Sequence, residues 1–250
     1  MDLALAAVFL APGLAFGSFL NVVAARVPLK RSIVRPASAC MSCGHEIAWY
    51  DNVPLVSWFV LRGRCRSCDA GISFRYPAVE LVTGLLVAGC VLKFGLSADA
   101  AVAAVFCLAL VAVSATDIEH RKIPNVIVVP AGLLLLAANT ALHPSPSWAL
   151  AALGASGFLF AAALAYPAGM GMGDVKLAFL MGAALGRTVP VAMLLGMASA
   201  LVPGIALLVR HGQAGRKIRI PFGPFLALGS AVALFAGHPL LHAYWGLFQR

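Results

Sequence analysis

Long apolar runs dominate this sequence and restrict what it can fold into. There are eight of them, at about residues 3–25, 78–94, 98–116, 124–142, 148–168, 175–186, 189–209 and 222–248. A helix needs about 20 mostly apolar residues to cross a bilayer. With 62% hydrophobic and 11% charged residues, the chain has too little polar surface to coat a soluble globule. We therefore expect an all-α polytopic membrane protein with about eight transmembrane helices, the sixth of which is short and shielded by its neighbours.

One polar segment interrupts this pattern, between Arg26 and Tyr76. The apolar run before it lacks the basic start and the cleavage site of a signal peptide, so we expect residues 1–25 to form a retained first transmembrane helix. Residues 26–76 are predicted to form a small insert. Residues 77–250 are predicted to form the main membrane domain.

The eighteen lysines and arginines are distributed unevenly among the loops. If residues 26–76 face the cytoplasm, then every basic residue except Lys93, Arg187 and Arg250 lies on that side. The positive-inside rule requires such an asymmetry, so the N-terminus is expected outside and the insert in the cytoplasm. Topology thus explains the net charge of +9. No basic stretch is interleaved with aromatic residues, so we expect a lipid bilayer and no nucleic acid as partner.

The insert contains two Cys-x-x-Cys pairs, formed by Cys40, Cys43, Cys65 and Cys68. The two sulfurs of one tight turn can reach the same ion, and two such pairs supply the four thiolates that Zn²⁺ accepts. A disulfide or redox site is the alternative, but disulfides do not persist in a reducing cytoplasm. We expect a structural zinc site that contributes most of the insert's folding free energy.

Glycines flank both cysteine pairs. Gly44, Gly63 and Gly71 suit the positive-φ positions of such turns. His45 is expected to be a surface residue, because four thiolates already complete the zinc shell.

Two aspartates end or begin apolar runs on the side predicted to be cytoplasmic. Asp117 ends the third run and Asp174 begins the sixth. An ionisable group beside the hydrocarbon is costly and indicates function. Two carboxyl groups in close contact would share one proton, so that one could take a proton from water while the other polarises a carbonyl. The alternative is that both are ordinary helix-end residues, with Asp174 favoured by the helix dipole.

Alternating glycines precede Asp174, at Gly169, Gly171 and Gly173. Glycines at this spacing disfavour a helix, so we expect extended or irregular backbone with room for a substrate strand to pair. Lys176 is expected to anchor the helix end at the interface or to support Asp174.

These motifs together resemble the bacterial type IV prepilin peptidases. The N-terminal resemblance rests on residues 17–23 (GSFLNVV), the two cysteine pairs, and residues 49–54 (WYDNVP), 61–65 (LRGRC) and 75–81 (RYPAVEL). The C-terminal resemblance rests on Asp117 with residues 123–125 (IPN), the G-x-G-D motif at 171–174, and residues 221–224 (PFGP) and 226–229 (LALG). The resemblance covers nearly the whole chain.

The resemblance implies an eight-helix aspartic protease of the bacterial inner membrane. Such enzymes remove the leader of type IV prepilins and pseudopilins at the cytoplasmic face, and the motif match makes Asp117 and Asp174 the catalytic pair, with Gly171 and Gly173 as supporting motif. Members with the cysteine insert also methylate the new N-terminus, using S-adenosylmethionine. No Rossmann-type fingerprint marks a site for this methyl donor, and Gly63 is the one candidate for it, since a glycine allows close backbone approach.

Two other classes of function are compatible with parts of the pattern. A transporter or channel could use Asp117 and Asp174 as a cation relay, although transporter sites usually lie nearer the bilayer midplane. A membrane scaffold could bind a partner through its zinc module, but that would give no reason for the alternating glycines.

Overall fold

The computed structural model describes residues 2–166, 170–212 and 220–248, and the chain divides into two compact units, 1–119 and 120–250. Gly169, Arg250 and the basic residues between 213 and 219 lie outside the described residues. The described elements are helical, and the only β-pairing among them consists of two isolated bridges, Ala39 with Glu46 and Arg64 with Gly71.

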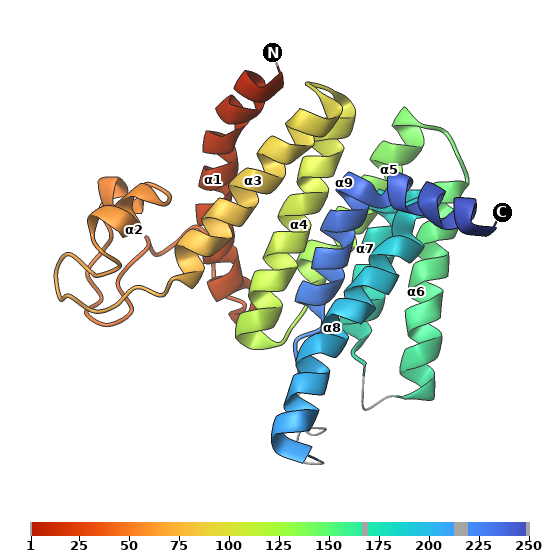
Figure 1. The fold of residues 1–250 in the computed structure, drawn as a ribbon. Helices are drawn as coiled ribbons and strands as arrows, with labels where there is room; N and C mark the ends of the chain where they lie inside the picture. The colour runs from red at the N-terminus through yellow and green to blue at the C-terminus, as the bar shows by residue number, and fades with distance from the viewer. Residues whose placement is uncertain (1, 167–169, 213–219, 249–250) are drawn as a thin grey trace. The chain divides into compact units, whose positions relative to one another are not determined.

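The N-terminal unit contains three long helices and the polar insert (Figure 1). Its elements are α1 (Asp2–Arg26), η1 (Val27–Leu29), η2 (Trp49–Asn52), α2 (Val56–Val60), α3 (Arg75–Phe94) and α4 (Ala98–His120). Helices α1 and α3 lie side by side and antiparallel, with the insert joining their adjacent ends. An ion pair of 2.8 Å between Arg75 and Glu119 ties the start of α3 to the last turn of α4.

Glycines bring the backbones of α1 and α3 close together. A Cβ added at Gly13 would lie 2.9 Å from the Cα of Gly84, and one at Gly17 would lie 2.6 Å from the Cα of Glu80. The Gly-x-x-x-Gly spacing allows this approach in a membrane, where association depends on close packing. One turn further, the Asn21 side-chain amide donates to the backbone oxygen of Tyr76 at 3.1 Å. Contacts between the two helices therefore recur every four residues, forward along α1 and backward along α3.

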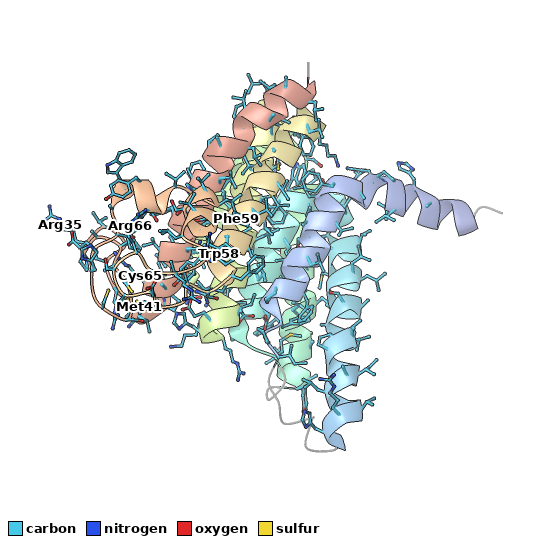
Figure 2. The ribbon with its side chains drawn as sticks, turned by 60° about the vertical axis from the view of Figure 1, so that its left-hand side comes forward. Arg35, Met41, Trp58, Phe59, Cys65 and Arg66 are labelled. Atoms are coloured by element: carbon cyan, nitrogen blue, oxygen red, sulfur yellow. The ribbon has the colours of Figure 1, made fainter. Side chains whose placement is uncertain are left out.

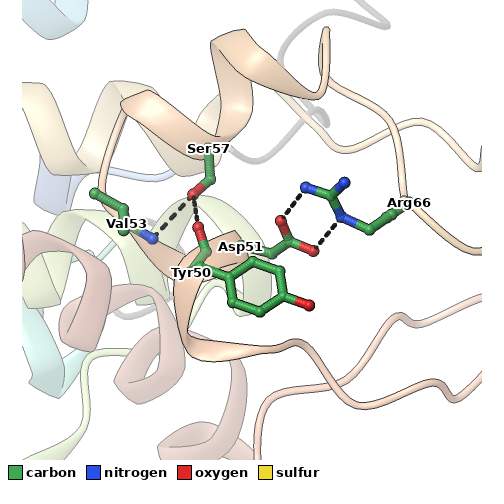
Figure 3. A network of polar contacts seen from close by, with 5 residues as sticks. All are labelled: Tyr50, Asp51, Val53, Ser57 and Arg66. Carbon is green, nitrogen blue, oxygen red and sulfur yellow. Dashed lines mark hydrogen bonds and ion pairs between the residues drawn. The ribbon is translucent and has the colours of Figure 1, made fainter.

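The insert is held together by polar and aromatic contacts (Figures 2 and 3). The Trp58 indole donates to the backbone oxygen of Ile72 at 3.1 Å, and its ring contacts those of Phe59 and Phe74 edge to face. Figure 2 labels Trp58 and Phe59. The Ser57 hydroxyl donates to the backbone oxygen of Tyr50 and accepts from the amide of Val53.

The C-terminal unit is a helical bundle. Its elements are α5 (Asn125–Leu142), α6 (Ser147–Ala165), α7 (Met172–Leu185), η3 (Gly186–Thr188), α8 (Val189–His211) and α9 (Gly223–Phe248). Helix α7 packs against α5 and α6, and α8 packs against α9. The short α7 is the sixth run expected from the sequence, and Leu177, Leu180 and Met181 on it are fully buried. A Cβ added at Gly182 would lie 2.5 Å from the Cα of Ala152 in α6, so these two helices also approach closely.

Among the described residues, seven segments are long and apolar enough to cross a membrane. One of them, Met172–His211, has 40 residues and contains both α7 and α8. With these two counted separately, the expected set of about eight membrane helices is present, and the all-α polytopic fold class is confirmed. The alternating-glycine segment differs in part from expectation: Gly171 is extended, but Gly173 lies within the first turn of α7.

The close contact between α1 and α3 generates a prediction for Gly17. Gly17→Leu should destabilise the N-terminal unit by about 1–3 kcal/mol or more, because its side chain would meet backbone that cannot move aside. Thermal unfolding of the purified protein in detergent measures this change. Ala15→Leu is the matched control, because Ala15 lies on the same helix with its side chain exposed. Equal unfolding temperatures for the two variants would contradict the close packing.

Candidate functional site

The four cysteines of the insert come together in one cluster. The sulfurs of Cys40, Cys43, Cys65 and Cys68 all lie within 4.8 Å of one another. Those of Cys40 and Cys68 are 3.8 Å apart, which is about the edge of a tetrahedron around an ion with bonds of about 2.3 Å to sulfur. The donor set and its spacing therefore fit zinc.

The two cysteine turns have the same backbone pattern. Cys40 donates its amide to the backbone oxygen of His45 at 2.9 Å, and Cys65 donates to that of Ala70 at 2.8 Å. The residue after each pair has positive φ: Gly44 at 72° and Asp69 at 55°. Sequence reasoning expected Gly71 in such a conformation, and that expectation is wrong, because the second turn places Asp69 there.

The thiols of the cluster differ strongly in acidity. The pKa of Cys40 is lowered to about 6, first by hydrogen bonding from the backbone of Cys43 and then from that of Ser42. For Cys68, hydrogen bonding from the Ala70 backbone lowers the pKa, but contacts with Cys43 and the other thiols, together with burial, outweigh it and raise the pKa to about 12. Crowded thiols cannot all ionise without a cation between them, and a divalent metal ion would allow it.

An ion pair joins the two halves of the insert. Arg66, which lies between Cys65 and Cys68, donates to both carboxylate oxygens of Asp51 at 2.7 and 2.6 Å (Figure 3). The hydrogen bond from Arg66, and then its charge, hold the pKa of Asp51 below its usual range. The pair is therefore ionised at neutral pH and is lost only when the solution is acidified below the ordinary range of an aspartate.

Glu80 attaches the insert to α3, and Gly63 permits a turn and a close packing contact within the insert. The Glu80 carboxylate on α3 accepts the amide of Leu55 at 2.8 Å, so the insert is bonded directly to a membrane helix. Gly63 has a φ of 67°, and a Cβ there would lie 2.9 Å from the Trp58 ring. The turn and the packing thus explain this glycine without a ligand.

Asp117 lies in the last turn of α4, in the N-terminal unit. Its residue is 6% exposed, and it belongs to a buried stretch that includes Ala115 and Thr116. The Asp117 carboxyl group is therefore buried and lies three residues before the end of a membrane-type helix.

Asp174 lies in the first turn of α7, in the C-terminal unit. One of its carboxylate oxygens accepts the amide of Gly171 at 3.2 Å, which fixes the approach of the chain to the helix. Two residues later, the Lys176 ammonium donates to the side-chain oxygen of Asn125 at 2.9 Å, and this bond joins the starts of α5 and α7. A Cβ added at Gly173 would lie 2.9 Å from that of Ile123, so the loop between α4 and α5 approaches the glycine motif closely. The structure thus gives Gly173 a packing reason that the spacing of the glycines did not predict.

The zinc hypothesis predicts the effect of removing one ligand. Cys40→Ser should abolish stoichiometric zinc in the purified protein, because three thiolates and a hydroxyl hold zinc far more weakly than four thiolates. Elemental mass spectrometry measures the metal directly. Cys90→Ala is the control, because it removes a thiol in α3 outside the cluster. Full zinc occupancy in Cys40→Ser would contradict the proposed ligand set.

Two family models match the chain, one in each half. The Bacterial Peptidase A24 N-terminal domain matches residues 12–94, and the Type IV leader peptidase family matches residues 104–205. The second match includes both Asp117 and Asp174. No solved structure matches the chain.

Curated relatives carry one common name, "Prepilin leader peptidase/N-methyltransferase". The chain is 42% identical to the protein of Myxococcus xanthus, in an alignment that covers 82% of this chain and 64% of that protein. It is 36% identical to the protein of Bacillus subtilis, with 93% of this chain and 94% of that protein covered. It is also 36% identical to the protein of Pseudomonas aeruginosa, with 93% and 90% covered. The chain therefore belongs to the type IV leader peptidase family, as an enzyme with the bacterial N-terminal domain of that family.

Proposed function

We propose that this protein cleaves the leader from type IV prepilins or pseudopilins and then methylates the new N-terminus. The observation that carries the proposal is that the peptidase-family match contains two aspartates at ends of membrane-type helices, Asp117 in α4 and Asp174 in α7. The names of the relatives support both activities. Family membership gives no support to the transporter or channel alternative.

The proposed peptidase reaction uses the two aspartates as a pair that shares one proton. The ionised carboxylate takes a proton from water, and the resulting hydroxide attacks the carbonyl carbon of the scissile peptide bond. The protonated carboxyl group supports the oxygen that becomes negative. The nitrogen takes a proton from the aspartate pair as the C–N bond breaks, which leaves a free amine on the mature pilin and a carboxyl group on the leader that ionises in solution.

Chain connectivity supports the pairing of Asp117 with Asp174. A short link runs from the end of α4 to Asn125 at the start of α5, and Asn125 is bonded to Lys176, one turn or less from Asp174. In this proposal Lys176 positions the first turn of α7 and does not touch the substrate. The extended, exposed backbone at Gly171 offers the pilin strand a surface without side chains.

The proposed arrangement in the cell follows the charge distribution. The N-terminus lies outside, and the insert lies in the cytoplasm of a bacterium, at its inner membrane. The hydrophobic helix of the prepilin would lie in the bilayer while its basic leader stays at the cytoplasmic surface.

The methyl-transfer half of the proposal needs a donor and a neutral amine. S-adenosylmethionine supplies an electrophilic methyl group on sulfur. The amine nitrogen of the cleaved pilin forms a bond to that carbon as the carbon–sulfur bond breaks, and the amine gives up a proton to solvent. Zinc, held by the four cysteines, would have a structural role, because a complete thiolate shell leaves no position for a reactant.

Substitution of either aspartate tests the peptidase mechanism. Asp117→Asn and Asp174→Asn should each slow leader cleavage by at least about 10³-fold, because an amide cannot share the proton. Asn at 174 can still accept the amide of Gly171, so the helix start should survive. The measurement is the mass of a purified prepilin after incubation with each variant in detergent.

Asp99→Asn is the control for loss of one negative charge, because Asp99 lies at the other end of α4. Its cleavage rate should equal that of the unmodified enzyme. Cleavage at an undiminished rate by either Asp117→Asn or Asp174→Asn would contradict the aspartate pair.

A further inference from the structure

A cavity of about 310 Å³ lies within the N-terminal unit, between α1 and the insert. Its wall comes from the second half of α1, the segment from the first cysteine turn to η2, and the segment from the second cysteine turn to the start of α3. The volume is at the lower end of the range for small-molecule sites, about 300–1,000 Å³. Neither Asp117 nor Asp174 lines it, so the peptidase reaction does not account for it.

Asn21 lines this cavity and has an unused hydrogen-bond acceptor. The residue is 5% exposed. Its side-chain nitrogen donates to the backbone oxygen of Tyr76, and because that oxygen can only accept, the amide can face only one way. The side-chain oxygen Oδ1 then receives no hydrogen bond from any residue that the structure describes. Leaving a buried acceptor unsatisfied costs about 1–3 kcal/mol, so a ligand with an N–H group would be stabilised here.

The cavity also contains a carboxylate with acceptor positions to spare. The Asp51 side chain is 12% exposed, and each of its oxygens receives one hydrogen bond from Arg66. An ionised carboxylate offers about four lone-pair positions. The remaining ones can accept hydroxyl groups, such as the two hydroxyls of a ribose.

Two tyrosines complete the chemical character of the wall. Tyr50 and Tyr76 both line the cavity, and the Arg66 guanidinium lies 5.8 Å from the centre of the Tyr50 ring. Aromatic rings stack on planar bases and attract cations. An acceptor for N–H, a carboxylate for hydroxyls and aromatic rings for a base or a cation together suit a nucleoside that carries a positive charge.

We propose that this cavity is the binding site for S-adenosylmethionine, with Asn21 Oδ1 accepting from an N–H of the donor and Asp51 accepting from its ribose. The assignment rests on the proposed methylation, and it gives that reaction a location that the sequence did not. Gly63, the candidate from the sequence, does not line the cavity. Cys40 and Cys65 do line it, so the zinc cluster supports one wall of the site.

Binding of tritiated S-adenosylmethionine to the full-length enzyme in detergent tests the proposal. Asn21→Leu should weaken binding by about tenfold or more, because the acceptor is lost. Ala25→Leu should weaken it at least as much, because Ala25 lines the cavity and a larger side chain there fills it without removing any polar group. Ala15→Leu, on the same helix but outside the cavity wall, should bind like the unmodified enzyme. Zinc content and helical circular dichroism establish that each variant is folded.

Ultraviolet cross-linking of the same tritiated donor to the unmodified enzyme gives a location that needs no variant. The label is expected in peptides from residues 18–76, above all those containing Tyr50 or Tyr76. Label confined to other peptides would overturn the proposal, and so would unchanged affinity in a zinc-loaded, folded Ala25→Leu. If Ala25→Leu and Asn21→Leu both lose zinc, the cross-linked peptide decides.

The same experiment separates this inference from the proposed function. If the unmodified enzyme cleaves prepilin but neither binds the donor nor methylates the product, the proposed methylation is wrong, and the cavity assignment is wrong with it. If the enzyme methylates the product and binds the donor, but neither cavity substitution changes its affinity for the donor, only the assigned location is wrong.

Discussion

The close antiparallel contact between α1 and α3 fixes the points at which the insert is attached in the N-terminal unit. In a bilayer no hydrophobic force drives two apolar helices together, so their association depends on how closely the backbones can approach. Gly13 and Gly17 permit that approach, and the matched spacing then sets Asn21 against Tyr76 and brings Glu80 to the amide of Leu55. The insert is bonded to the membrane helices at these points. A cavity between α1 and the insert exists only while this contact holds its two sides in place.

Much of this fold follows from the sequence because the bilayer leaves few choices. Backbone polar groups must be satisfied within each segment, so a long apolar run has to be a helix. The expected runs accordingly match the observed helices within a few residues, as α3 and α8 illustrate. The four-cysteine cluster was also readable, because the spacing of each pair is a local property of one turn. Asp117 also lies where the apolar pattern places it, at the end of a membrane-type helix, and it is buried there.

The remaining features depend on contacts between segments that are distant in the chain. Asn21 looks like an ordinary polar residue near a helix end until Tyr76, fifty-five residues later, fixes its amide. The positive φ of Asp69 is set by the backbone pattern of the second cysteine turn. Residue preference alone would place a glycine, such as Gly71, in that conformation. Position 173 requires a glycine because a Cβ there would lie 2.9 Å from that of Ile123. A sequence signal was present for the contact between α1 and α3, because Gly13 and Gly17 stand at the spacing of close helix pairs.

The order of the two proposed reactions follows from the chemistry of the nitrogen that links them. Before cleavage this nitrogen belongs to a peptide bond, and its lone pair is delocalised into the carbonyl group. It becomes nucleophilic only when hydrolysis releases it as an α-amino group, so methylation has to follow cleavage. The pKa of an α-amino group is about 7.7–8.0, which leaves roughly a tenth of the amine neutral at pH 7. A site that receives the new N-terminus must therefore favour the neutral amine or accept its proton. In the proposed cavity the cationic donor disfavours a second positive charge, so donor binding would itself promote the form of the amine that reacts. The carboxylates of Asp51 and Glu46 on the cavity wall act in the opposite direction, and the paired Arg66 offsets that of Asp51.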